Sequence, residues 1–140
     1  MAQTDKMKQT LDKLEAGVRD FYTSEKFLTY LQVMSRFHNY SLNNQILIAA
    51  QMPEATIVAG YNSWMRNFER HVKKGERSIT ILAPQKIKIK VDTDKTDEYG
   101  NVIQEEKEGI KFRPVSVFDV SQTEGKPLPE LTTELTGEVS

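Results

Sequence analysis

The chain has 140 residues, of which 38% are hydrophobic and 28% charged, and its formal net charge is −1. This length and composition are typical of one globular domain. Cysteine is absent, which excludes disulfides, thiolate metal sites and a cysteine nucleophile. No apolar run approaches the roughly 20 residues of a membrane span. The first ten residues lack the apolar core of a signal peptide, so we expect a cytoplasmic protein without a membrane partner.

Three amphipathic helices are predicted in the first 51 residues. Apolar residues recur every three or four positions from residue 7 to 21 and again from 27 to 37, as they do on one face of a helix. A third helix is expected from residue 42 to 51, because Ser41 is a natural N-cap and Pro53 cannot continue a helix.

The pattern then changes to short strands. Residues 55–60 (ATIVAG) are β-branched and end at a glycine, and residues 61–71 (YNSWMRNFERH) have the spacing of a short helix. Residues 78–83 (SITILA) predict a strand. Residues 86–91 (KIKIKV) alternate strictly, so their lysines face one side and their apolar residues the other. Residues 92–108 hold seven acids and two lysines and are expected to form a solvated, flexible hairpin loop.

The segment after this acidic loop predicts a returning strand. Ile110 and Phe112 are expected to face inward, and Lys111 and Arg113 outward, on the same face as the lysines of the preceding strand. Pro114 cannot donate a ladder hydrogen bond. A bulge at Pro114 is therefore expected, which would explain why the apolar positions beyond it move by one residue.

These elements predict an α+β domain over residues 1–123. Its N-terminal helices pack on a small antiparallel β-sheet that carries a long acidic hairpin loop. Residues 124–140 are rich in Thr, Glu, Pro and Gly. We expect them to form a flexible linker toward a further domain.

No self-sufficient active site is visible in the sequence. The two histidines, His38 and His71, lie far apart and have no metal-ligand spacing, and phosphate-binding glycine loops are absent. The acids gather in segments that are expected to be flexible, which hold a catalytic pair poorly. We therefore expect no catalytic residue, no metal and no cofactor in this chain.

Positive charge is concentrated between residues 60 and 91, which carry a net charge of +6, while the remainder carries −7. The local field, and not the total charge, governs the binding of a polyanion. The opposing interpretation is that these side chains are only solvated surface. The cations predicted to contact DNA are Arg66, Arg70, Lys73, Lys74, Arg77, Lys86, Lys88 and Lys90 in this stretch, and Lys111 and Arg113 beyond it.

Residues 38–51 (HNYSLNNQILIAAQ) are polar in their first half and apolar in their second. The polar half would face a ligand, since its amides lie beside the free N–H groups of a helix N-terminus, while the apolar half enters the core. The alternative is that Asn43 and Asn44 only cap the helix. The side chains predicted to contact DNA here are Tyr40, Ser41, Asn43, Asn44 and Gln45.

Aromatic residues lie close to these cations in the sequence. Single-stranded nucleic acid is bound by a basic groove that follows the phosphates and by exposed rings on which the bases stack. Tyr40 and Tyr61 border turns and are the better stacking candidates. Trp64 is also a candidate, although rings at helical spacing are more often core, and we expect Trp64 and Phe68 to be largely buried.

Two blocks carry the most specific pattern in the chain, YSLNNQILIAAQMPEATIVAGYNSWMRNFERHVKKGERSITILAP and FRPVSVFDVSQTEGKPLP. Together they resemble the N-terminal domain of ArdC-type antirestriction proteins, which occur on plasmids and other mobile elements. The resemblance implies single-stranded DNA binding. In the full proteins a metallopeptidase domain with an H-E-x-x-H motif follows, and because that motif is absent here, peptidase activity is not carried over. The matched positions are Ser41, Asn44, Gln45, Trp64, Lys73, Lys74, Gly75, Gln122 and Thr123.

We therefore predict a monomeric, non-enzymatic domain that binds single-stranded DNA with little sequence preference, as part of an antirestriction protein. The first alternative is a protein–protein module that docks a restriction or conjugation enzyme and uses the acidic loop to mimic nucleic acid. The second is a targeting unit for an enzyme elsewhere in the parent chain. Salt dependence separates DNA binding from protein docking, since the salt slope counts phosphate contacts.

Overall fold

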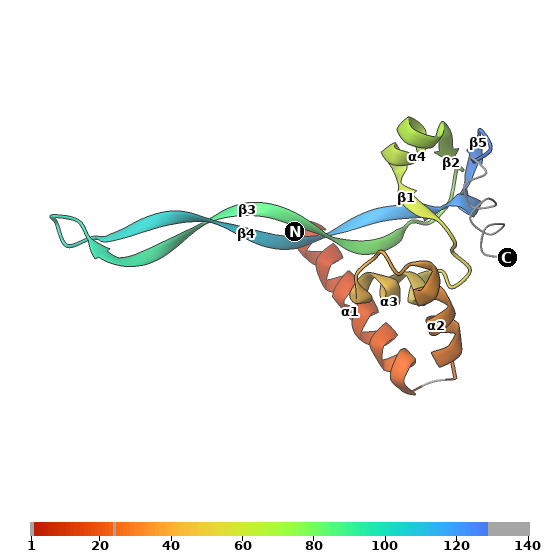
Figure 1. Cartoon of the computed structure of the whole chain (residues 1–140), viewed down its shortest axis with the longest axis horizontal. Coiled ribbons are helices and arrows are strands. Elements are labelled where there is room, and N and C mark those ends of the chain that lie inside the picture. The colour runs from red at the N-terminus through yellow and green to blue at the C-terminus, as the bar shows by residue number, and fades with distance from the viewer. Residues whose placement is uncertain (1, 24, 129–140) are drawn as a thin grey trace.

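Three helices form the first part of the chain: α1 (Ala2–Thr23), α2 (Phe27–Arg36) and α3 (Leu42–Gln51). The computed structural model describes residues 2–23 and 25–128. Figure 1 shows the helices gathered beside one end of a long two-stranded ribbon. The three predicted helices are confirmed. Ser41 caps α3 as predicted, because its Oγ accepts a hydrogen bond from the backbone N–H of Asn44 at 3.3 Å.

Two small antiparallel sheets follow the helices. The larger has the strand order β1-β4-β3, and helix α4 (Tyr61–Phe68) directly follows β1. The smaller pairs β2 with β5, and a 3₁₀ turn (Val120–Gln122) joins β4 to β5. The predicted α+β class is thus confirmed. The strands are β1 (Val58–Gly60), β2 (Arg70–Val72), β3 (Ile79–Thr96), β4 (Val102–Asp119) and β5 (Thr123–Gly125).

The paired structure continues past the domain boundary expected at residue 123. Glu124 pairs with His71, and Gly125 pairs with Arg70, in the β2–β5 ladder. Residues 129–140, which belong to the expected linker, lie outside the described residues.

One apolar cluster joins the helices to the base of the larger sheet. The close packing of α1 on α3 depends on Gly17, since a Cβ at this position would lie 2.8 Å from Cγ2 of Ile46. The least exposed apolar residues of the cluster are Leu47, Ile48, Val33, Tyr30, Ala49, Ala55 and Ile79.

Helix α3 covers the free edge of β3 with two side-chain amides. Asn44 donates to the carbonyl of Leu82 and accepts from its N–H, both at 2.8 Å. Gln51 makes the same pair of bonds with Thr80, at 2.8 and 3.0 Å. These amides take the place of a neighbouring strand, so the backbone groups of a buried edge are satisfied.

The acidic segment 92–108 is not the flexible loop expected from its composition. β3 continues to Thr96 and β4 begins at Val102, so only five residues form the turn. Asp97 closes this turn by accepting hydrogen bonds from the backbone N–H groups of Tyr99 and Asn101, each at 2.9 Å. Strand pairing is possible because the acids of β4 face the lysines of β3, so that opposite charges oppose each other across the ribbon.

The predicted distribution of side chains between the two faces of the ribbon is wrong. Lys86 pairs with Ile110 and Pro84 with Phe112, so the lysines of β3 share a face with the apolar residues of β4. Lys111 and Arg113 lie on the opposite face. The expected bulge is also wrong, because Leu82 pairs with Pro114 in unbroken register and the irregularity lies between Asp92 and Thr96. The apolar positions of β4 move by one residue at Pro114, and only those beyond it, Val115 and Val117, pack in the apolar cluster, while Ile110 and Phe112 are exposed.

The outer ribbon, which consists of residues 84–96 of β3 and residues 102–112 of β4, is expected to contribute little to the stability of the domain. From residue 84 to 96 it extends about 40 Å, away from the helices (Figure 1), and none of these residues belongs to the apolar cluster. Replacing residues 89–107 with Asn-Gly joins Lys88 to Glu108, which are direct cross-strand partners. The free energy of unfolding should change by less than about 1 kcal/mol in urea denaturation. A loss of several kcal/mol would show that the ribbon supports the body.

Candidate nucleic-acid interface

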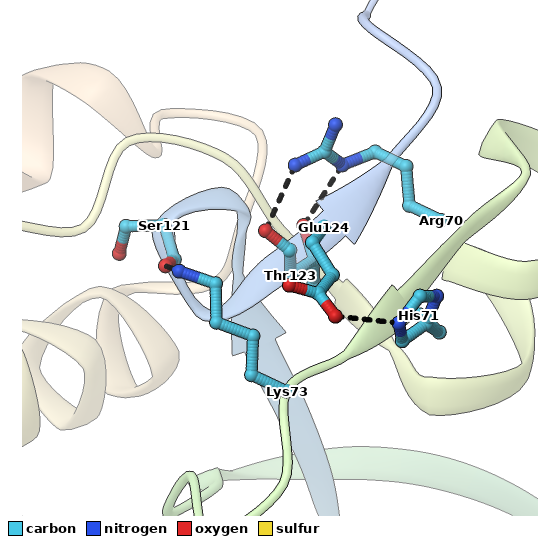
Figure 2. A network of polar contacts seen from close by, with 6 residues as sticks. All are labelled: Arg70, His71, Lys73, Ser121, Thr123 and Glu124. Carbon is cyan, nitrogen blue, oxygen red and sulfur yellow. Dashed lines mark hydrogen bonds and ion pairs between the residues drawn. The ribbon is translucent and has the colours of Figure 1, made fainter.

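Arg70 joins β2 to β5 through its guanidinium (Figure 2). Its Nε donates to Oγ1 of Thr123 at 2.9 Å, and a terminal nitrogen donates to the carbonyl of the same residue at 2.9 Å. The other terminal nitrogen donates to the carbonyl of Lys126 at 2.8 Å. Three of the five guanidinium N–H groups of Arg70 thus donate within the domain, which gives this residue a structural role, and its contact with DNA stays a prediction.

The two lysines of the β2–β3 turn differ in their surroundings. The Nζ of Lys73 donates to the carbonyl of Ser121 at 3.2 Å, as Figure 2 shows, and its backbone N–H donates to the carbonyl of Gln122 at 2.9 Å. Lys74 is exposed and has no hydrogen bond or ion pair among the described residues. Gly75 has the positive φ of +86° that the predicted turn requires. Of the pair, Lys74 is the freer cation.

Arg66 and Arg77 are the other exposed cations among those predicted at this end of the domain. Neither side chain has an acidic partner in the described part of the chain. Arg77 also lines a surface pocket of about 320 Å³ together with Lys13, Gln51 and Glu54. This pocket places a cation from α1 near the start of β3, although those two segments are far apart in the sequence.

The ribbon removes most of the charge asymmetry seen in the sequence. Lys88 pairs with Glu108 and Lys90 with Glu106, and Nζ of Lys88 lies 4.0 Å from a carboxylate oxygen of Glu106. Lys86 differs from both, because its cross-strand partner is Ile110. Among the three lysines, Lys86 is thus the one without a directly opposed acid.

The predicted cations beyond residue 108 belong to the other face of the ribbon. Lys111 lies opposite Gln85, and Arg113 lies opposite Ala83. Both side chains are exposed. The ten predicted cations therefore do not form one surface but are divided among the β2–β3 end and two faces of the ribbon.

The polar start of α3 is largely engaged inside the protein. Asn44 is only 8% exposed and both ends of its amide bind Leu82, so the expectation that it faces a ligand is wrong. Gln45 donates to the carbonyl of Tyr40 at 2.9 Å. Tyr40 is half-buried, packs edge-to-face on Phe37 and donates to the carbonyl of Val58 at 3.4 Å, and burial raises the pKa of its phenol.

Of the aromatic candidates on α4, only Tyr61 is exposed. Trp64 is 0% exposed and its indole N–H donates to the carbonyl of Phe118 at 2.9 Å. Its ring cannot stack on a base, which corrects its place among the DNA contacts and confirms the expectation that it is buried. Phe68 is half-buried beside it. Tyr61 is 51% exposed and packs edge-on against Phe118.

An apolar groove lies where α1, the start of α3 and the ribbon meet. Its volume is about 310 Å³. It contains two of the predicted residues, Ser41 and Asn43, and one that the sequence analysis placed in the interior, Phe112, which is 53% exposed. The remaining lining residues are Met7, Leu11, Leu14 and Leu82.

A buried carboxylate that the sequence analysis did not single out connects the larger sheet to the following turn. Asp119 accepts from the backbone N–H groups of Thr56 and Ile57, at 2.8 and 3.1 Å, with one oxygen. Its other oxygen accepts from the N–H and hydroxyl of Ser121 at 3.0 and 2.6 Å. Gln122 completes a capping box by accepting from the N–H of Asp119 at 2.8 Å. The spacing D-x-x-Q was the signal for it.

Within residues 2–23 and 25–128, no group of three His, Asp or Glu side chains is arranged to hold a metal ion. The same residues contain no helix long and apolar enough to cross a membrane. The described structure thus defines a small α+β domain whose candidate binding features are exposed cations, the exposed rings of Tyr61 and Phe112 and an apolar groove.

The chain belongs to the family of the N-terminal domain of the anti-restriction factor ArdC, whose model matches residues 2–118. It is 28% identical over 144 aligned positions to pXO2-81, an uncharacterised protein of Bacillus anthracis; the alignment covers 91% of this chain and 24% of that protein. It also aligns with the crystal structure of metal-free ArdC from plasmid R388, with 17% identity and a TM-score of 0.45, over 71% of this chain and 41% of that one. The chain therefore spans less than half the length of each.

Proposed function

We propose that this domain binds single-stranded DNA with little base preference, as a part of an antirestriction protein. The observation that carries the proposal is a set of exposed cations that are not spent on internal ion pairs. Six of the predicted cations are exposed and have no ion pair, side-chain hydrogen bond or directly opposed acid among the described residues, and exposed rings lie on α4 and β4. These cations are Arg66, Lys74, Arg77, Lys86, Lys111 and Arg113.

Cations of this kind suit phosphates, because each contact releases a counterion and the affinity then falls with salt. The rings suit single strands better than duplexes, since stacking needs bases that are not already paired and stacked. The proposal includes no reaction, and the metallopeptidase chemistry of the resembled full-length proteins is not assigned to this domain.

A charge reversal tests the proposal. Lys74→Glu with Arg77→Glu should weaken binding to all labelled single-stranded oligonucleotides similarly and flatten the slope of log affinity against log salt by about 1.4. Fluorescence anisotropy at 50 and 200 mM salt, with single- and double-stranded probes, measures both.

The matched control is Lys95→Glu with Lys107→Glu, which makes the same charge change on the acidic outer ribbon. It should leave the salt slope unchanged. Wild-type protein that does not bind single-stranded DNA at 50 mM salt would contradict the proposal.

Docking of a basic protein surface is a second candidate, and the outer ribbon favours it. Residues 92–108 carry a net charge of −5 and extend away from the helices (Figure 1), so they would repel DNA and attract a basic partner. The chain shortened by replacing residues 89–107 separates the two functions. If the DNA proposal holds, this shortened chain should bind DNA at least as well as the wild type. If a protein partner docks through the ribbon, the shortened chain should no longer bind that partner.

A further inference from the structure

We infer that the groove between α1, the start of α3 and the ribbon takes one unstacked nucleobase, with Phe112 as the ring on which it stacks. This inference rests on the proposed binding of single-stranded DNA and names the base-contacting part of that site. Neither Phe112 nor the groove was expected from the sequence, since the strand pattern placed this ring inside.

The groove combines the surfaces that a base requires. Met7, Leu11 and Leu14 of α1 form an apolar lining together with Leu82, and Phe112 supplies an aromatic ring that is 53% exposed. Sites for flat heteroaromatic ligands have this composition, an apolar lining with a small number of polar groups that fix orientation.

Polar groups stand at one side of the groove only. Ser41 and Asn43 belong to the start of α3 and both line it. The first turn of a helix leaves backbone N–H groups without an intrahelical acceptor. The amide of Asn43 is exposed and has no hydrogen bond among the described residues. Unlike the buried amide of Asn44, it is available to the edge of a base.

A cation lies on the same face as the ring. Lys86 is cross-strand from Ile110, two residues from Phe112 along β4, and the register places all three side chains on one side of the ribbon. Since Lys86 has no directly opposed acid, a phosphate next to the stacked base would meet an uncompensated positive charge. Alternation of cations and exposed rings along a strand is how single strands are held.

The size of the groove argues against larger occupants. Its volume of about 310 Å³ is at the lower end of small-ligand sites. A helix would need a continuous groove with anchors over two turns. A second copy of the chain would have to bury about 800 Å² on each partner, far more than the groove supplies. One base fits these limits.

The test replaces the ring by an apolar side chain that cannot stack. Phe112→Leu should weaken binding of a fluorescein-labelled oligothymidylate by about five- to a hundredfold, whereas Phe112→Tyr should bind as the wild type does. Because Phe112 is half exposed, the variants are expected to fold, and a thermal melt checks this. The matched control is Ile110→Ala, which removes a 65% exposed side chain from the same face outside the groove and should not change affinity.

A second readout detects stacking directly. The chain has one tryptophan, Trp64, which is fully buried, so Phe112→Trp introduces the only exposed indole. Oligothymidylate should quench its fluorescence on binding, while the emission of the wild type stays unchanged. If wild-type protein binds the oligonucleotide but Phe112→Leu binds equally well and Phe112→Trp is not quenched, the inference is overturned while the proposed function stands. If the wild type does not bind at all, the proposed function fails first.

Discussion

Asp119→Ala is expected to lower the free energy of unfolding by about 3 kcal/mol or more, because it leaves several buried donors without an acceptor. The carboxylate is 2% exposed and accepts from the backbone N–H groups of Thr56, Ile57 and Ser121. These residues lie on separate segments, so the loss should affect both the start of β1 and the turn after β4. Urea denaturation measures the change. Asp94→Ala, on the exposed ribbon, serves as control and should stay within about 0.5 kcal/mol of the wild type.

The same carboxylate makes the stability of the domain depend on pH. Burial alone would raise the pKa of Asp119, but the hydrogen bonds from Ser121, Thr56 and Ile57 outweigh it and hold the pKa below its ordinary value of 3.8. A group with a lowered folded-state pKa contributes stability that is present above its unfolded-state pKa. That contribution is lost as the pH falls through the folded-state value.

Urea midpoints recorded between pH 6 and pH 3 test this. The wild type should lose more stability over this range than Asp119→Asn, which has no carboxylate to protonate. Parallel curves for the two proteins would mean that Asp119 does not contribute to the acid sensitivity.

Asn44→Ala is expected to cost about 2 kcal/mol or more, because the N–H and carbonyl of Leu82 would be left unpaired in a buried place. Asn43→Ala is the matched control. It removes an identical, exposed side chain one residue earlier, and its effect on stability should be within about 0.5 kcal/mol. Equal and small losses for the two variants, in the same denaturation experiment, would contradict the role of Asn44 in covering the edge of β3.

Asn43 and Asn44 show which features of α3 could be predicted from the sequence and which could not. Local rules predicted the helix, its cap at Ser41 and its apolar second half, since each depends on residues within a few positions. The partner of Asn44 is 38 positions away. Gln51 finds its partner 29 positions away. Nothing local separates an amide that covers a sheet edge from one that faces solvent, so the polar segment was interpreted as a ligand surface.

The predicted arrangement of side chains on the ribbon was wrong for a different reason. The alternating pattern predicts that the apolar residues of both strands share a face, but which residues share a face is set by the number of residues in the turn. The five-residue turn after Thr96 places even-numbered residues of the two strands together, as in the pair Lys86 and Ile110. Two extra residues in β3 near Asp92 do not alter this parity. The pairing also brings the acidic segment back onto the basic one, so charge counted along the sequence overstated the field in space.

The position of the DNA on the domain is the central claim, and photo-crosslinking measures it most directly. A single-stranded oligonucleotide with 5-iododeoxyuridine at successive positions is bound at low salt and irradiated, and mass spectrometry locates the crosslinked side chains. The account predicts crosslinks at Phe112 and Tyr61, and none in residues 92–108. Crosslinks confined to residues 92–108, or a bound oligonucleotide that never crosslinks at Phe112 or Tyr61, would contradict it.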